Sequence, residues 1–285
     1  MPSSSSSAGP LWQFQELETT IGKDYQSTAE VEVYDETHSI FRDVRQEARH
    51  VLKELLQVQP NTVLLDFGCG TGTCVIEAAR SCGLKAVHGI DVSPTMIERA
   101  KQKVARELVG GDTSSSTTTT TNIQFHHGGF LTYQHADGDG VVDYITTTYA
   151  LHHLPDLWKQ VALQRLAKLL KPNGKLHIHD VVVVGVGTPS TTTRDTIQEE
   201  EDGITAKIQK FVQTQSDLGD RHEDDGFLKD DAETHFRDEF STLDWVLEGM
   251  LERAGLDVVS KDVEENGVIV TYLCQKKPTT SSSTS

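Results

Sequence analysis

The sequence predicts a doubly wound α/β domain with a mostly parallel, seven-stranded sheet and an antiparallel last strand. Strand-like and helix-like segments alternate between residues 63 and 184, which is the pattern of βαβ units with right-handed crossovers. The last two strand-like segments, 256–263 and 268–274, are separated only by a short turn. Because a two-stranded hairpin is antiparallel, the last strand must run against the others.

Each element has its own signal in the sequence. Ser93 offers a side-chain N-cap, and Pro94 suits the first helical position that follows it. Asp156 is expected to cap a later helix, and Ser241 is expected to begin the final helix, with Asp244 in the capping-box position. The predicted strands are 63–67, 86–90, 123–127, 141–148, 175–184, 256–263 and 268–274, and the predicted helices are 75–81, 94–108, 156–170 and 241–254.

One domain, residues 61–277, is expected to contain all these elements, with its motifs concentrated in 63–180. The Ser/Thr-rich stretch 110–121 is predicted to be an inserted surface loop. Ser, Thr and Pro residues also dominate both ends of the chain. We therefore expect poorly ordered tails at residues 1–20 and 278–285. Residues 21–60, ahead of the domain, are expected to form a lid and a helix.

The segment 185–240 is acidic and lies where substrate-covering elements belong. It has fifteen Asp or Glu residues against six Lys or Arg residues. Such a charge run is typical of a solvated face or loop and requires no partner. The apolar residues in this segment predict one short amphipathic helix; they are Ile204, Ile208, Phe211 and Val212.

Composition restricts the class of function. A formal net charge of −17 argues against binding to nucleic acid, which requires clustered Lys and Arg. The longest apolar run, within 181–186, is too short to span a bilayer, and the start of the chain lacks the features of a signal peptide. The four cysteines form no CxxC pair, which favours a reducing compartment. We expect a soluble, cytoplasmic protein with a small-molecule partner and no membrane partner.

The strongest single signal is the segment VLLDFGCGTG, residues 63–72. A strand that runs into three closely spaced glycines and then a helix makes a turn where backbone amides can approach a ligand. The GxGxG spacing differs from the GxGxxG of dinucleotide-binding proteins, whose third glycine would stand at Thr73. Asp66, two residues before the first glycine, would repel a pyrophosphate but attract a sulfonium or ammonium group.

A second carboxylate follows at the end of the next strand. Asp91 lies where an acidic side chain can accept hydrogen bonds from both hydroxyls of a ribose. The alternative role for Asp91 is to cap the next helix, but Ser93 already fills that position. The pattern therefore indicates a nucleoside site in which Asp91 binds the sugar.

Four segments together resemble the successive motifs of class I S-adenosylmethionine methyltransferases, and most closely the group whose domain is called methyltransferase type 11. The resemblance covers about 63–180 and implies a Rossmann-like fold, S-adenosyl-L-methionine as cofactor, and methyl transfer. Because the four motifs occur in order at the right intervals, the match is specific. They are VLLDFGCGTG, GIDVS, VVDYITTTYALHHLPD and LAKLLKPNGKLHIHDV.

The same resemblance implies a set of cofactor-binding residues. The glycines wrap the methionine part, Asp66 holds its amino group, and Asp91 binds the ribose. Many relatives have an acidic residue after the third strand to recognise the adenine, but here Gly129 stands there, so backbone groups and Phe130 are expected to serve. The implied set is Asp66, Gly68, Gly70, Gly72, Asp91, Val92, Met96, Gly129, Phe130 and Thr147.

Catalytic residues are only weakly indicated, because the cofactor itself carries the activated methyl group. Candidates are side chains at the carboxyl ends of strands, where such sheets place their sites. His152 and His153 follow the fourth strand, and only one of the two is expected to face the site. Asp180 ends the fifth strand as a substrate contact, and Tyr34 lies in the predicted lid. No set of residues has recognisable metal-ligand spacing, so no metal site is predicted.

The sequence therefore predicts a methyltransferase acting on a small molecule, whose acceptor atom and substrate it does not name. Two alternatives remain open. One is a non-catalytic scaffold that keeps the fold in order to bind a protein. The other is a nicotinamide-dependent oxidoreductase, against which Thr73 argues.

Overall fold

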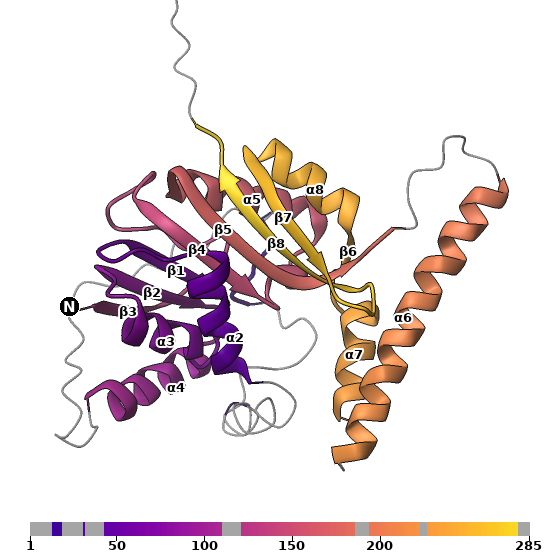
Figure 1. The fold of residues 1–285 in the computed structure, drawn as a ribbon, viewed down its shortest axis with the longest axis horizontal. Coiled ribbons are helices and arrows are strands. Elements are labelled where there is room, and N and C mark those ends of the chain that lie inside the picture. The colour runs from indigo at the N-terminus through magenta and orange to yellow at the C-terminus, as the bar shows by residue number, and fades with distance from the viewer. Residues whose placement is uncertain are drawn as a thin grey trace, which may run out of the picture.

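The computed structural model describes residues 13–18, 31, 43–109, 121–185, 194–222 and 227–278. Its centre is one twisted sheet in the order β3-β2-β1-β4-β5-β8-β7, with the short β6 paired to β5 (Figure 1). Only β8 runs against its neighbours, as the hairpin predicts. The strands are β1 Val63–Phe67, β2 Ala86–Asp91, β3 Asn122–His127, β4 Val142–Thr148, β5 Leu170–Val183, β6 Thr242–Leu243, β7 Leu256–Val263 and β8 Ile269–Lys276.

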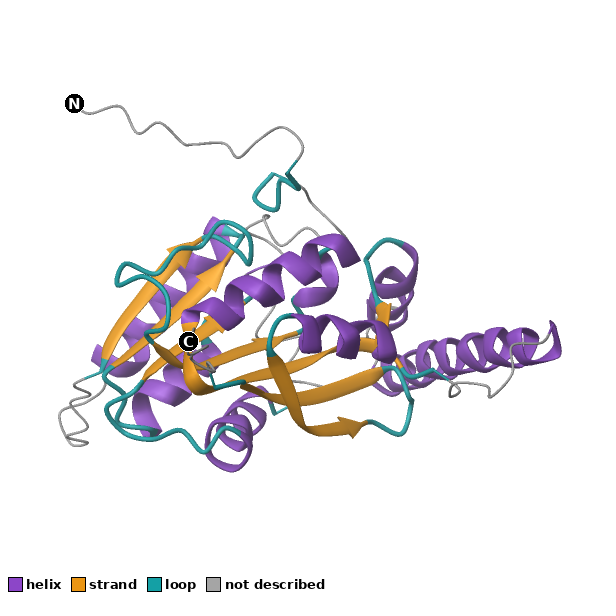
Figure 2. Cartoon of the chain, turned by 90° about the horizontal axis from the view of Figure 1, so that it is seen from above, coloured by secondary structure: helices purple, strands orange, loops and turns teal. Residues whose placement is uncertain are grey.

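Helices cover both faces of the sheet (Figure 2). They are α2 Val44–His50, α3 Thr73–Ser81, α4 Pro94–Val104, α5 Asp156–Leu169, α6 Arg194–His222, α7 Phe227–Arg237 and α8 Asp244–Arg253, with the short π-helices η1 Val51–Leu55 and η2 Ala105–Val109 and the 3₁₀ helix η3 Leu151–His153. None of the helices in the described ranges is long and apolar enough to cross a membrane.

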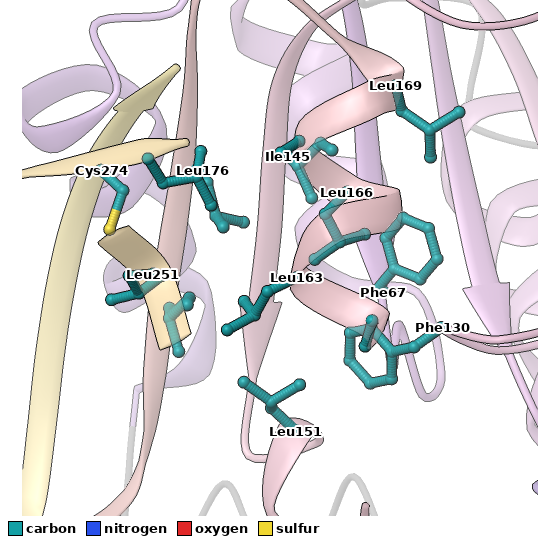
Figure 3. Packing of buried hydrophobic residues seen from close by; sticks show 14 of the residues in the cluster. Phe67, Phe130, Ile145, Leu151, Leu163, Leu166, Leu169, Leu176, Leu251 and Cys274 are labelled. Atoms are coloured by element: carbon teal, nitrogen blue, oxygen red, sulfur yellow. The ribbon is translucent and has the colours of Figure 1, made fainter. Parts of the chain in front are cut away.

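The core is divided by the sheet, because successive side chains of a strand point to opposite faces. Leu65 and Phe67 of β1 belong to a buried cluster with side chains of α5 and α8 on one face. Figure 3 shows Phe67 in this cluster with Leu163 of α5 and Leu251 of α8. Leu64, which precedes Leu65, packs with α3 and η1 on the other face. β1 is therefore buried on both sides, which holds its carboxyl end, and the turn that follows it, in a fixed position.

The Ser93 cap forms as predicted, since its hydroxyl accepts a hydrogen bond from Met96 N at 3.1 Å. Two other caps were wrong. Asp156 is the first residue of α5 rather than its cap, and its carboxylate binds Lys159 and Thr242 instead. The final helix begins at Asp244, three residues after Ser241.

Tertiary contacts displace the expected start of α8. Residues 242–243 join the sheet as β6, so the chain is extended where a helix was predicted. The Ser241 hydroxyl donates to His235 O, and the Asp244 carboxylate accepts from Gly185 N and pairs with Lys261. Contacts with residues distant in the sequence are therefore more favourable here than the local capping hydrogen bonds.

The acidic segment forms two helices instead of the single short helix predicted. α6 has 29 residues, and α7 lies beside it at one end of the sheet (Figure 1). Phe211 of α6 and Ala232 of α7 are buried against Val181 and Val183 of β5. The predicted apolar stripe at residues 204–212 does lie on α6. The helical turns on either side of it are mostly polar, so the sequence did not indicate the full length of α6.

Candidate active site

A cavity of about 1110 Å³ opens at the carboxyl ends of β1, β2 and β4. This is the edge at which doubly wound sheets place their ligands. One wall is the glycine turn after β1, and the cover is formed by α6 and α7. The strand ends, the loops that follow them and the cover all contribute to the lining. It includes Asp66, Gly68, Gly70, Asp91, Val92, Met96, Gly129, Phe130, Thr148, His152, His153, Phe211 and His235.

The glycine turn is built from left-handed backbone. Gly68, Gly70 and Gly72 have φ values of +70°, +51° and +80°. A Cβ on Gly68 would lie 2.3 Å from the Cβ of Ala150, so no side chain fits there. Gly68 and Gly70 line the cavity. Gly72 is the N-cap of α3, and a Cβ there would press on Phe125, so it serves the packing of the turn from outside the cavity.

We expect Gly68→Ala to lower the free energy of unfolding by about 1–3 kcal/mol, because it combines a strained φ with a steric overlap. Gly255→Ala is the matched control: its φ is +80°, but no atom lies within 4 Å of the added Cβ. Urea unfolding of both variants separates the two costs. An equal loss in both variants would show that the approach of Ala150 is unimportant.

Two carboxylates stand at the glycine turn. Asp91 accepts hydrogen bonds from Gly70 N and Ser93 N, both at 2.8 Å, so it ties the end of β2 to the turn. Burial raises the pKa of Asp91, while these hydrogen bonds oppose the rise. Burial, with repulsion from Asp91, raises the pKa of Asp66 to about 8. The site therefore holds two buried acidic groups that favour a positively charged or hydrogen-bond-donating ligand.

The predicted adenine residues also meet at this cavity. Met96 and Phe130 are buried, and Val92 is half-buried beside them. Sequence reasoning missed Glu16, whose carboxylate fills the space that a Cβ on Gly129 would need, at 2.6 Å. Glu16 accepts hydrogen bonds from Leu131 N at 2.9 Å and from the Thr132 hydroxyl. An acidic group thus lies beside Gly129, although it comes from the start of the chain.

At the end of β4 the structure brings Thr148 and Tyr149 to the cavity, rather than Thr147. Thr147 is fully buried and lies outside the cavity lining. Because side chains alternate along a strand, Thr146 and Thr148 share the face that meets the cavity. Tyr34 lies outside the described residues.

His177 and His179 of β5 have protein partners. His179 Nδ1 is hydrogen-bonded to the Thr271 hydroxyl at 2.7 Å, and its Nε2 to the Tyr149 hydroxyl at 3.0 Å. His177 Nδ1 lies 3.2 Å from the Thr146 hydroxyl. Both rings are therefore held in place as part of the cavity wall.

Opposite the glycine turn, His152 is held between two carboxylates. Its Nδ1 donates to Asp180, which also accepts from Leu151 N at 2.8 Å. Its Nε2 lies 3.1 Å from Glu239. Burial alone would lower the pKa of His152, but the attraction of Asp180 and Glu239 outweighs this and raises it to about 10. The two carboxyl groups in turn have pKa values held below their usual range by His152, against the effect of burial.

His153 lies next to this group, and its side chain is 29% exposed toward the cavity. Burial and the charge of His152 lower the pKa of His153 to about 3, so its ring is neutral near pH 7. Contrary to expectation, both histidines reach the cavity, with ring centroids 4.3 Å apart. The reason is that residues 151–153 form a 3₁₀ turn, which does not alternate side chains as a strand does.

Glu239 and His235 were missed by sequence reasoning. His235 Nδ1 donates to Glu239, and the Phe240 amide donates to His152 O at 3.0 Å. These contacts attach the end of α7 to the histidine turn. Nothing in the spacing of residues 235–240 indicated that His235 and Glu239 reach the histidine turn.

Comparison with known proteins gives a family. The sequence pattern described as "Methyltransferase domain" matches residues 40–261. A demethylmenaquinone methyltransferase from Bacillus mycoides is 30% identical over 146 residues, which are 50% of this chain and 55% of that protein. A 27-O-demethylrifamycin SV methyltransferase from Amycolatopsis mediterranei is 24% identical over 157 residues, 55% of this chain and 52% of that protein. The chain thus spans about half the length of these curated relatives.

Solved structures confirm the predicted fold. The cyclopropane synthase MmaA2 from Mycobacterium tuberculosis has a TM-score of 0.55 at 15% identity, with 83% of this chain and 88% of that chain covered. A geranyl diphosphate C-methyltransferase from Streptomyces coelicolor, solved with Mg²⁺, geranyl-S-thiolodiphosphate and S-adenosyl-L-homocysteine, has a TM-score of 0.53 at 14% identity, with 90% of this chain and 83% of that chain covered. The match over residues 40–261 and this likeness of fold together confirm the resemblance to class I methyltransferases seen in the motifs.

Proposed function

Because the chain belongs to the methyltransferase domain family, we propose that it transfers a methyl group from S-adenosylmethionine to a small-molecule acceptor. The observation that carries the proposal is the pair of buried carboxylates, Asp66 and Asp91, beside the glycine turn. A ligand with positive charge near Asp66 and hydroxyl donors near Asp91 offsets the cost of burying these groups. S-adenosylmethionine has both, in its sulfonium and ammonium groups and in its ribose.

In this proposal each part of the donor meets its own residues. Asp66 binds the ammonium group, and the backbone of Gly68 and Gly70 follows the methionine part. Asp91 accepts from the ribose hydroxyls. The adenine lies among Val92, Met96, Gly129 and Phe130. Thr148 replaces Thr147 in the implied set and lies beside the methyl group. Gly72 acts by setting the start of α3.

The bound donor supplies a methyl group activated by its positively charged sulfur. The residues of the chain align donor and acceptor and exclude water. We place the acceptor against His153, because this neutral ring is the one in the histidine turn that is partly exposed to the cavity. His152 and Asp180 are buried and hold the turn, so they act as positioning residues.

The acceptor is proposed to be small and partly apolar. The cover of the cavity contributes the apolar side chains of Phe211, Leu218 and Leu228. The relatives named above carry quinone and rifamycin precursors in their names, which are compounds of this kind. The net charge of −17 opposes a nucleic-acid substrate.

The direct test is to incubate the protein with a metabolite extract and isotopically labelled S-adenosylmethionine and to search for labelled products by mass spectrometry. We expect at least one labelled small molecule. With that product in hand, His153→Ala is expected to lower kcat by about 10²-fold while the affinity for S-adenosylhomocysteine stays within about twofold, because His153 meets the acceptor and not the donor.

Asp139→Ala is the control, since Asp139 is exposed and lies outside the cavity. Binding of S-adenosylhomocysteine without transfer to any acceptor would favour the scaffold alternative. If the protein binds neither S-adenosylmethionine nor S-adenosylhomocysteine, the proposal is overturned.

A further inference from the structure

Three potential metal ligands converge at the histidine turn. One nitrogen each of His152 and His153 and one carboxylate oxygen of Glu239 lie within 4.8 Å of one another. The two histidines line the cavity, and the side chain of Glu239 is only 3% exposed behind them. Such a cluster differs from a surface group of acidic residues, because two of its three members are imidazoles.

The hydrogen bonds of His152 determine which nitrogen is available. Asp180 is a carboxylate and accepts, so the proton of a neutral His152 ring stays on Nδ1. Nε2 then presents a lone pair, is fully buried, and makes no contact with hydrogen-bond geometry. The atom facing it at 3.1 Å is Glu239 Oε2, which is also an acceptor. A positive charge between these two atoms, either a proton on Nε2 or a metal ion in its place, satisfies both of them.

A second pair of atoms repeats the arrangement. His153 Nδ1 lies 3.7 Å from Glu239 Oε1, which is too long for a hydrogen bond. Two ligand atoms bound about 2.1 Å from a tetrahedral metal ion are about 3.4 Å apart. The distances of 3.1 and 3.7 Å lie on either side of this value.

We propose that His152, His153 and Glu239 bind a divalent transition-metal ion of the zinc type. Imidazole ligands favour such an ion over Mg²⁺ or Ca²⁺, which prefer oxygen. The contacts around the three ligands are those found in metal sites: Asp180 holds the far nitrogen of His152, and His235 donates to Glu239. Three protein ligands leave an open position, and the histidines direct it toward the cavity.

The sequence alone predicted no metal because the ligands come from two separate segments. His152 and His153 are adjacent in η3, whereas Glu239 follows α7. No motif with fixed spacing connects them. The inference concerns metal binding by this chain and does not depend on the proposed methyl transfer.

The test uses the full chain without a histidine tag, stripped with a chelator and titrated with Zn²⁺ in a calorimeter. We expect about one equivalent to bind. Glu239→Gln and His153→Ala are each expected to weaken binding by at least about tenfold. Titration with Co²⁺ is expected to give a visible absorption spectrum of a low-coordinate site, which both variants lose.

The control is His126→Asn. His88 and His126 form a separate histidine pair between β2 and β3, with Nδ1 and Nε2 3.0 Å apart, and His126 lies outside the cavity lining. The variant is expected to bind Zn²⁺ as the wild type does. If Glu239→Gln does not fold by circular dichroism, His153→Ala decides the result. Absence of Zn²⁺ binding, unchanged binding in His153→Ala, or loss of binding in His126→Asn would overturn the proposal.

Discussion

Replacing Asp91 with alanine is expected to weaken the binding of S-adenosylhomocysteine by about 10²–10⁴-fold. Two charge-assisted hydrogen bonds to the ribose are lost, each worth roughly 1.5–3 kcal/mol. The amide of Gly70 also loses its acceptor, which loosens the glycine turn. Isothermal titration calorimetry measures the effect directly, without knowledge of the acceptor.

Two further variants test whether the loss of affinity comes from the charge of Asp91 and from its position. Asp91→Asn keeps the shape but removes the charge, so its affinity is expected to fall between those of the wild type and Asp91→Ala. Glu98→Ala, an exposed acidic residue on α4, is expected to bind as the wild type does. An affinity within twofold of wild type in Asp91→Ala would show that the ribose lies elsewhere.

The second large effect is on stability. We expect Asp180→Ala to lower the free energy of unfolding by about 3–5 kcal/mol, because the buried, positively charged His152 ring keeps only Glu239 of its two carboxylate partners. The substitution also removes the acceptor for Leu151 N and Val181 N, at 2.8 Å each. Urea unfolding at pH 6, with the protein stripped of metal by a chelator, measures this free energy.

The pH of this measurement matters. The raised pKa of His152 gives stability that is complete below its unfolded value of about 6.5 and is lost as pH rises to about 10. The lowered pKa of Asp180 gives stability that is present above about pH 4 and lost on further acidification. The difference between wild type and Asp180→Ala is therefore expected to shrink toward both extremes.

Asp257→Ala is the control for Asp180→Ala. Asp257 also pairs with a cation, Lys277 at 3.3 Å, but its side chain is 63% exposed. Exposed pairs contribute little, so the change is expected to stay within about 0.5 kcal/mol. A loss of similar size in both variants would mean that burial of the Asp180 pair is not the source of its stability.

The part of the site nearest the glycine turn was predictable because it is local. Residues 63–93 form one continuous strand, turn, helix and strand, so spacing along the chain fixes positions in space. The structure places Gly68, Gly70 and Asp91 together at the cavity, while their roles toward a cofactor stay predictions. Thr147 was less predictable, since its neighbours Thr146 and Thr148 are identical in type. Only the helices packed on each face decide which threonines meet the cavity.

The histidine side of the site was predictable only in part. His152 and His153 follow β4, and Asp180 lies near the carboxyl end of β5, so all three could be named as candidates. Glu239 could not, because its position depends on the pairing of β6 with β5 and on the bond from Phe240 to His152. The failed caps at Asp156 and Ser241 have the same cause. Each of these residues takes its structure from contacts that are far away in the sequence.

The position of Glu16 against Gly129 makes the cavity wall a shared property of two distant parts of the chain. Any compound that binds better when this segment is docked must, by the same free energy, favour its docking. For such a compound, occupancy of the adenine end and attachment of residues 13–18 are thermodynamically coupled.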